Sequence, residues 1–259
     1  MSRLEGKNFL VTGAANGIGA AACRKLISEG ARVAGLDIDT TGLKALTDEL
    51  GADRFIAFEG SAADLCDIEA ARDGAVESWG GLDGGLFCAG MVGTSAPIHE
   101  YPIDLYDRIM NLNVRGSFLG LKTIVPALEK RGGGSVLFVS SINGIKGFAS
   151  FSAYATSKQA VTGLMKTASI DLAARNIRVN SIHPGLTSTQ MMRDVEEIVS
   201  PDDLQAAHDS FAAIAALKRY ADPSEIATSI AFLLSDEASY ITGSMNVIDG
   251  GFTTGIAGA

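Results

Sequence analysis

A glycine-rich turn near the N-terminus is the stretch of this sequence best suited to bind a ligand. Gly13, Gly17 and Gly19 follow the apolar run 9–11 and precede a helical stretch that begins at residue 20. Glycine has no Cβ, so the chain can turn sharply and a ligand can touch the backbone. The helix that follows presents unpaired N–H groups and a positive dipole end, which suits a pyrophosphate. The spacing G-x-x-x-G-x-G differs from the dinucleotide fingerprint G-x-G-x-x-G, so an ordinary tight turn is the alternative.

An acidic residue follows this turn at the distance expected of a ribose ligand. Asp37 lies eighteen residues after Gly19, at the end of an apolar run that predicts a second strand. Dinucleotide-binding sequences place such an acid about 20 residues on, where its carboxylate accepts hydrogen bonds from the adenosine ribose. The carboxylate also repels a 2′-phosphate, and Ala15 and Asn16 carry no positive charge, so NAD is favoured over NADP. The alternative is that Asp37 caps the helix expected near residue 41.

Further groups that could do chemistry lie in the second half of the chain. Ser141 ends an apolar run that predicts a strand, and Asn113 lies among apolar residues in a helical stretch, where it needs hydrogen-bond partners. Tyr154 and Lys158 are four residues apart in another helical stretch, so they lie on one helix face, one turn apart. Taken singly, Tyr154 could equally be an aromatic core residue and Lys158 a solvated charge.

Alternating strands and helices must position these groups. Strands are expected at 9–11, 31–39, 54–58, 82–90, 135–141, 177–182 and 245–249, with helices at 20–27, 41–50, 65–79, 103–130, 151–175 and 223–234. Most of these strands are apolar runs, which is typical of a parallel sheet covered on both faces. The sequence therefore predicts an α/β, doubly wound single domain over 1–259, and ligands bind such sheets beyond the carboxyl ends of the strands.

Three details of these elements are predicted from single residues. Asp64 and Asp222 are expected to be helix N-caps, and Pro126 is expected to mark a kink or a late turn of the helix over 103–130. The segment 187–208 is expected to be irregular. With its flanks, at about 186–215, it is the expected substrate loop.

Composition excludes several classes of protein. The net charge of −9 argues against a nucleic-acid partner, because phosphates need a basic surface. Apolar runs fall short of a membrane span, and the N-terminus lacks the apolar stretch of a signal peptide, so a cytoplasmic location without a membrane partner is expected. Three widely spaced cysteines and three histidines show neither a disulfide framework nor metal-ligand spacing, so no metal is expected.

The motifs in this order resemble the short-chain dehydrogenase/reductase family. The resemblance covers nearly the whole chain, as far as residues 249–251, and implies a single Rossmann-type domain that binds a nicotinamide dinucleotide. It is carried by Thr12-Gly13-x-x-x-Gly17-x-Gly19, Asn113, Ser141, Tyr154-x-x-x-Lys158 and Pro184-Gly185.

The resemblance implies a role for each of four catalytic residues. Tyr154 is the general acid/base that exchanges a proton with the substrate oxygen, and Ser141 positions that oxygen. Lys158 lowers the pKa of Tyr154 and binds the nicotinamide ribose, while Asn113 holds a water that links Lys158 to solvent. A phenol with a pKa near ~10 is a poor base at neutral pH, and a nearby ammonium and the positive ring of the oxidised cofactor favour the phenolate.

The resemblance also implies the cofactor contacts. Two positions depart from the family pattern: Phe87-Cys88 stands where two amide side chains are usual, and Ser61 where an aspartate commonly holds the adenine. The cofactor-binding residues expected are Gly13, Asn16, Gly17, Ile18, Gly19, Asp37, Ile38, Ser61, Ala62, Ala89, Gly90, Tyr154, Lys158, Pro184, Gly185, Thr187 and Thr189.

The expected activity is an NAD-dependent oxidoreductase that interconverts a secondary alcohol and a ketone. A neutral, fairly hydrophobic substrate such as a cyclic or aromatic ketone is expected from apolar residues near the site, namely Val92, Ile145, Phe148, Leu186, Met191 and Met192. Two alternatives are a 3-oxoacyl-carrier reductase, against which the acidic charge counts, and a non-catalytic dinucleotide-binding regulator. The family further implies a homotetramer that packs through the helices of Asn113 and Tyr154.

Overall fold

The computed structural model describes residues 2–255 and contains a seven-stranded parallel sheet in the order β3-β2-β1-β4-β5-β6-β7. The predicted doubly wound α/β fold is therefore confirmed. Its strands are β1 Asn8–Thr12, β2 Arg32–Asp37, β3 Phe55–Glu59, β4 Gly84–Phe87, β5 Gly134–Val139, β6 Ile177–Pro184 and β7 Met245–Ile248. The strand order reverses between β1 and β4, and such a reversal opens a crevice for ligands at the carboxyl ends of the strands.

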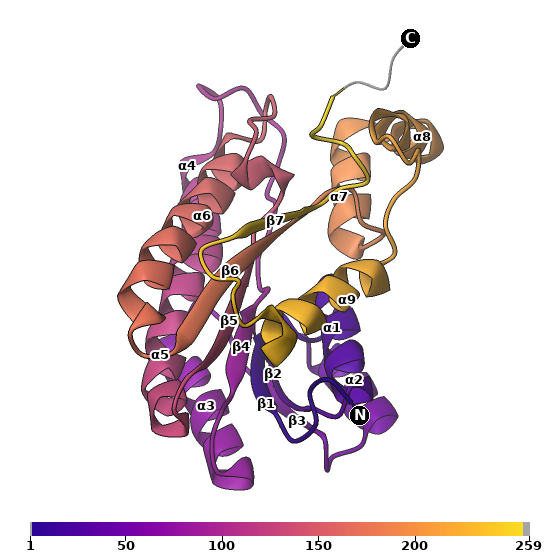
Figure 1. Cartoon of the computed structure of the whole chain (residues 1–259). Helices are drawn as coiled ribbons and strands as arrows, with labels where there is room; N and C mark the ends of the chain where they lie inside the picture. The colour runs from indigo at the N-terminus through magenta and orange to yellow at the C-terminus, as the bar shows by residue number, and fades with distance from the viewer. Residues whose placement is uncertain (1, 256–259) are drawn as a thin grey trace.

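Helices cover both faces of the sheet (Figure 1). One face carries α1 Gly17–Ser28, α2 Thr40–Leu50 and α9 Pro223–Leu234, and the other carries α3 Leu65–Trp79, α5 Gly116–Arg131 and α6 Ser152–Ala173. The short helix α4 Ile103–Ile109 joins α5 through a π-helical segment, Met110–Arg115. Within the described part of the chain, no helix is both long and apolar enough to cross a membrane.

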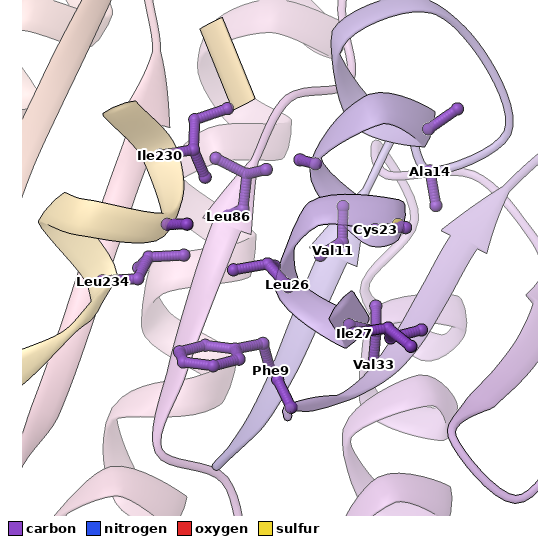
Figure 2. Close-up of a cluster of buried hydrophobic side chains, with 14 of the residues drawn as sticks. Phe9, Val11, Ala14, Cys23, Leu26, Ile27, Val33, Leu86, Ile230 and Leu234 are labelled. Atoms are coloured by element: carbon purple, nitrogen blue, oxygen red, sulfur yellow. The ribbon is translucent and has the colours of Figure 1, made fainter. Parts of the chain in front are cut away.

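Side chains of β1 are buried on both faces of the sheet. Phe9 and Val11 pack against α1 and α9, where Leu26 and Leu234 complete the cluster (Figure 2). Leu10, which lies between them in the strand, belongs to the cluster on the opposite face, under α3, α5 and α6. A strand that is covered on both faces needs no polar side, which explains the continuous apolar runs in the sequence.

Helix ends follow their capping residues. Asp64 accepts a hydrogen bond from the backbone N–H of Cys66 at the start of α3. At the start of α9, Asp222 accepts one from Ser224, Pro223 occupies the first turn, and Glu225 bonds back to the Asp222 N–H in a capping box. Both predicted N-caps are confirmed.

Pro126 lies within α5, which continues to Arg131, so the helix extends past the proline to the end expected from the sequence. The helix expected over 103–130 is interrupted earlier, by the π-helical segment that contains Asn113.

The segment expected to be irregular is largely helical, so that prediction is wrong. It forms α7 Gln190–Val199, and α8 Leu204–Ile214 follows after a short turn. Thr189 caps α7 by accepting from the Met192 N–H, and Asp203 caps α8. Mixed charge on the outer face of α7 hid its helical period in the sequence, because the apolar residues form only one face. Both helices stand beyond the carboxyl edge of the sheet (Figure 1).

Candidate active site

The glycine turn after β1 has the geometry that only glycine permits at two positions. Gly13 has φ +69°, and a Cβ there would lie 2.7 Å from the backbone of Ala89. A Cβ on Gly19 would lie 1.8 Å from the carbonyl oxygen of Gly13. The turn therefore brings the ends of β1 and β4 into contact at the point where the strand order reverses.

The start of α1 fits an anionic group. Asn16 is the N-cap residue, but its side chain turns away from the helix and donates to Asp39 Oδ2 at 2.8 Å. The Asn16 side chain therefore does not cap the N–H groups of Gly17 and Ile18, and both residues line the cavity described below. Unpaired amides at a positive dipole end bind phosphate well, so this turn fits the pyrophosphate of a dinucleotide.

Asp37 lines the same cavity at the end of β2. Its Oδ2 accepts from the Ala15 N–H at 2.9 Å and its Oδ1 from the Asp39 N–H at 3.0 Å, which fixes the carboxylate beside the glycine turn. The alternative role of Asp37 as a helix cap is wrong, because Asp39 caps α2 by accepting from Thr41 and Gly42. Hydrogen bonds from Asn16 and from the helix start lower the pKa of Asp39. Two carboxylates, Asp37 and Asp39, therefore lie beside the glycine turn.

Ser141, Tyr154 and Lys158 line the same cavity from two elements. Ser141 follows β5, and its Oγ accepts from the Asn143 N–H at 3.2 Å. Tyr154 and Lys158 lie on α6, with the Lys158 Nζ 5.5 Å from the centre of the Tyr154 ring. Lys158 Nζ also donates to the Val139 carbonyl at 2.9 Å, so α6 is joined to the end of β5.

Burial shifts the pKa of both groups on α6. It raises the pKa of Tyr154 to about 12, and the Ser141 hydroxyl opposes this by hydrogen bonding. It lowers the pKa of Lys158 to about 8, against the effect of Cys88. In the protein alone Tyr154 is thus a neutral phenol, a proton donor, while Lys158 is still mainly an ammonium at pH 7.

Asn113 is buried beside this group and does not line the cavity. Its side chain bonds both the N–H and the carbonyl of Met91, at 2.9 and 3.0 Å, and donates to Ser157 Oγ at 2.9 Å. A Cβ on Gly90 would lie 3.1 Å from Asn113 Oδ1 and 3.5 Å from Lys158 Nζ. Asn113 therefore ties the loop after β4 to α6, and its π-helical segment is of a kind often found at functional sites.

The structure brings most of the sequence-predicted residues to one cavity of about 380 Å³. Ala89, Gly90, Pro184, Gly185, Thr187 and Thr189 also line it. Five predicted residues do not: Gly19, Ile38, Ser61, Ala62 and Asn113. Ser61 instead forms a turn in which its Oγ accepts from the Ala63 N–H.

Apolar side chains form the rest of the wall, including Val92, Phe148, Leu186, Met191 and Met192 as expected, whereas Ile145 is absent from it and 42% exposed. Sequence reasoning missed Val195 on α7, Phe211 on α8 and Phe252 near the C-terminus. The Thr189 cap and the helical spacing of Met191, Met192 and Val195 were the signal available for α7. Phe252 packs against Phe148, with ring centres 5.8 Å apart. The two residues are far apart in the sequence, so no local pattern predicts this contact.

A family model described as enoyl-(acyl carrier protein) reductase matches residues 13–253. This range contains all the site residues described above. The chain belongs to the short-chain dehydrogenase/reductase family. Members of this family normally use a nicotinamide dinucleotide, NAD or NADP.

Three short-chain dehydrogenases/reductases illustrate the relationship. The chain is 38% identical over 256 residues to 3-alpha-(or 20-beta)-hydroxysteroid dehydrogenase of Mycobacterium bovis, covering 98% of this chain and 92% of the relative. It is 32% identical to levodione reductase of Leifsonia aquatica, covering 96% and 95%, and 32% identical to cyclohexanol dehydrogenase of an Acinetobacter species, covering 98% and 97%. The crystal structure of levodione reductase superposes with a TM-score of 0.93 at 31% identity, covering 96% and 98%. These relatives are oxidoreductases of secondary alcohols and ketones.

Proposed function

We propose that the protein is an NAD-dependent oxidoreductase that interconverts a hydrophobic secondary alcohol and its ketone. One observation carries the proposal: a hydroxyl, a phenol and an ammonium, from Ser141, Tyr154 and Lys158, face one cavity whose wall is otherwise mainly apolar. The glycine turn and Asp37 line the same cavity, and they fit the pyrophosphate and the adenosine ribose.

The residues present can carry the proton of this reaction. A bound nicotinamide dinucleotide supplies the hydride acceptor for oxidation and the donor for reduction. In reduction, the neutral Tyr154 phenol donates its proton to the substrate oxygen. The Asn143 N–H occupies a lone pair of Ser141 Oγ, which leaves the Ser141 proton free to point at the same oxygen.

The two other polar residues support this exchange. Lys158, held between Tyr154 and the Val139 carbonyl, provides positive charge that favours the phenolate in the oxidation direction. Lys158 is also proposed to hold the nicotinamide ribose. Asn113 is proposed to keep the loop after β4 in place beside Lys158 and to hold the water that links Lys158 to solvent.

The preference for NAD is proposed from charge. Asp37 lines the cavity, and Asp39 follows two residues later in the chain. Two carboxylates at this position repel the second phosphate of NADP, and the free lone pairs of Asp37 can accept from the ribose hydroxyls of NAD.

The substrate class is proposed from the cavity wall. Phe148, Leu186, Met191, Met192, Phe211 and Phe252 supply it, so the substrate beyond its reacting oxygen is best matched by a cyclic or aromatic skeleton. The names of the hydroxysteroid and cyclohexanol dehydrogenases among the relatives agree with such a skeleton. The region 186–215, which contains α7 and α8, is thus proposed to be the substrate-binding segment.

The test measures NADH absorbance with a panel of cyclic and aromatic secondary alcohols and ketones, with NAD(H) or NADP(H). We expect turnover with NAD(H), and a loss of about 100-fold or more in Tyr154→Phe, which keeps the ring but removes the proton. Tyr240→Phe is the matched control, because that side chain is fully exposed.

Two results would contradict the proposal. Turnover of a 3-oxoacyl-carrier substrate but not of any cyclic ketone would favour the carrier reductase. NADH binding by fluorescence without turnover of any substrate would favour a dinucleotide-binding regulator.

A further inference from the structure

His183 is a buried titratable residue that the proposed reaction does not yet use. It lies on β6, directly before Pro184 and Gly185, which line the cavity, but its own side chain is fully buried. A buried imidazole is stable only when both ring nitrogens have hydrogen-bond partners. These partners therefore indicate which part of the structure His183 stabilises.

Both ring nitrogens of His183 have a partner within the protein. Nδ1 lies 2.9 Å from the backbone carbonyl oxygen of Ser141, and Nε2 lies 2.8 Å from Ser181 Oγ. A carbonyl oxygen can only accept, so Nδ1 carries the ring proton. Nε2 of the neutral ring then accepts from the Ser181 hydroxyl. Burial lowers the pKa of His183 below that of a free imidazole; the hydrogen bond to Ser141 opposes this shift, and the positive charges of Lys158 and Lys166 add to it.

The carbonyl that His183 holds lies just beyond the last pairing of the sheet. The register of β5 and β6 ends at Val139 and Ile182, and Ser140 N–H donates to the Ile182 carbonyl at 2.9 Å. One residue further, the Ser141 carbonyl accepts from the Gly144 N–H at 2.8 Å and from His183. Two donors occupy its two lone pairs, and so they fix the plane of the peptide after Ser141.

We infer that His183 is a positioning residue for Ser141, and that its ring N–H fixes the Ser141 peptide and thereby aims the Ser141 hydroxyl at Tyr154 and the substrate oxygen. The inference rests on the proposed reaction. Ser181 takes part indirectly, because its hydroxyl selects the ring tautomer that can donate to Ser141.

A displaced Ser141 should change the proton chemistry of Tyr154. The groups that face Tyr154 are Lys158 from the same helix, Cys88 after β4 and Ser141 after β5, and of these the Ser141 hydroxyl favours the phenolate by hydrogen bonding. Loss of that bond raises the pKa at which alcohol oxidation begins. A defect confined to stability would leave this pKa unchanged.

The experiment compares four variants. His183→Leu removes the donor, whereas His183→Asn places an amide N–H close to the position of Nδ1. Ser181→Ala removes the hydroxyl that selects the tautomer. Ser135→Ala is the matched control, because Ser135 is a buried serine on β5 whose hydroxyl donates to the Leu233 carbonyl, away from the site.

We expect His183→Leu to lower kcat by about 10- to 100-fold, as a misplacement of about 1 Å does, with a smaller change in KM. The lower pKa of the pH profile for alcohol oxidation should rise by about one pH unit. Ser181→Ala should show both effects more weakly, His183→Asn should restore much of the loss, and Ser135→Ala should change only the unfolding temperature.

Hydrogen exchange of the peptide 139–146 gives a readout that needs no substrate. Exchange at residues 142–144 should increase in His183→Leu and Ser181→Ala, relative to Ser135→Ala. Unchanged exchange, or an unchanged kcat and pH profile in both His183→Leu and Ser181→Ala, would overturn the inference. If His183→Leu does not fold, Ser181→Ala and His183→Asn carry the same comparison. A wild-type protein without turnover would refute the proposed reaction instead, and the exchange data would still decide whether His183 holds Ser141.

Discussion

Lys158 shows how a residue needed for chemistry can oppose folding. The residue is 4% exposed, and its ammonium donates one hydrogen bond, at 2.9 Å, to the Val139 carbonyl. Burial lowers its pKa from 10.5 to about 8. Because the folded pKa is below the unfolded one, the buried charge costs stability at every pH below about 8, and the cost disappears as the pH rises towards 10.5. The gap between the two pKa values corresponds to roughly 3 kcal/mol.

We therefore expect Lys158→Met to abolish turnover and to raise the unfolding temperature by several degrees near pH 7 without cofactor. Methionine has similar length and no charge to bury. Calorimetry should show the gain shrinking between about pH 8 and pH 10. Lys166→Met, an exposed lysine on the same helix, is the control and should leave the unfolding temperature unchanged. A less stable Lys158→Met at pH 7 would show that the ammonium is well compensated.

Asp37 is expected to set the coenzyme preference. In Asp37→Ala, the hydrogen bonds to the adenosine ribose and the repulsion of a 2′-phosphate are both lost. The kcat/KM for NADH should fall by about 10- to 100-fold, the value of charged hydrogen bonds, while that for NADPH rises relative to it. Steady-state kinetics with both coenzymes provides the measurement, with the exposed Asp53→Ala as the control. An unchanged ratio means that Asp37 does not face the ribose.

At the residue scale, the site residues that could be predicted belong to motifs with short, regular spacing, whereas contacts between residues far apart in the sequence could not be predicted. Tyr154 and Lys158 were recognisable because four residues make one helical turn, and Asp37 because it follows the glycine turn at a known interval. The role of His183 could not be predicted from the sequence, because its partner Ser141 is 42 residues away and binds through its backbone carbonyl, which any residue type provides.

At the element scale, α7 and α8 are joined by a buried carboxylate. Glu196 on α7 is 7% exposed, and its Oε1 accepts from the Tyr220 hydroxyl at 2.6 Å. His208 on α8 lies 3.1 Å from the same oxygen and stacks on Tyr220 with ring centres 4.1 Å apart. Tyr220 precedes Ala221, which pairs with Thr187 at the rim of the cavity. The two helices are thus held to the chain segment that borders the cavity.

Removing the Tyr220 hydroxyl should loosen both helices. Tyr220→Phe leaves a buried carboxylate without one of its donors, at a cost of about 1–3 kcal/mol. Because α7 and α8 supply Met191, Met192 and Phe211 to the cavity wall, we expect a higher KM for a hydrophobic substrate and a smaller change in KM for NADH. Limited proteolysis within 190–214 should also become faster than in the control Tyr240→Phe. Unchanged KM and cleavage would show that the Tyr220–Glu196 bond does not hold the two helices.

The prediction of α7 failed for a physical reason. Its apolar residues face a cavity rather than a core, so a mainly polar surface surrounds a narrow apolar face. The helices that cover the sheet were easier to predict, because burial against two strands requires a broad apolar face. Asp, Gly and Pro residues also mark the ends of these helices.

At the scale of the whole molecule, exposed apolar side chains on α5 and α6 agree with the expected tetramer. Phe118 on α5 is 49% exposed and Ile170 on α6 is 78% exposed. If copies pack through these helices, Ile170→Glu places a charge in the interface and should shift the mass found by light scattering below that of a tetramer. Ala45→Glu, on the exposed side of α2, introduces the same charge on the opposite face and should leave the mass unchanged. A monomeric wild-type protein would rule out this assembly.

The fold as a whole was the most predictable level. Alternation of apolar strands with helices implies parallel pairing, and a parallel sheet covered on both faces follows from it. The strand order and the closing of the cavity by α7, α8 and Phe252 depend on contacts between distant segments, which alternation does not specify.

The packing of α9 against β1 and α1 has a consequence during protein synthesis. Leu234 completes the cluster around Phe9 and Leu26 (Figure 2), and β1 pairs on one side with β4, where Phe9 lies opposite Gly84. A ribosome adds roughly 5–20 residues per second, so the apolar face of α1 waits roughly 10–40 s for α9 to emerge. The N-terminal part of the fold is therefore synthesised first, but its core is covered only when α9 has been made. A nascent chain that stops before residue 223 exposes the apolar face of α1 to chaperones and to other unfinished chains.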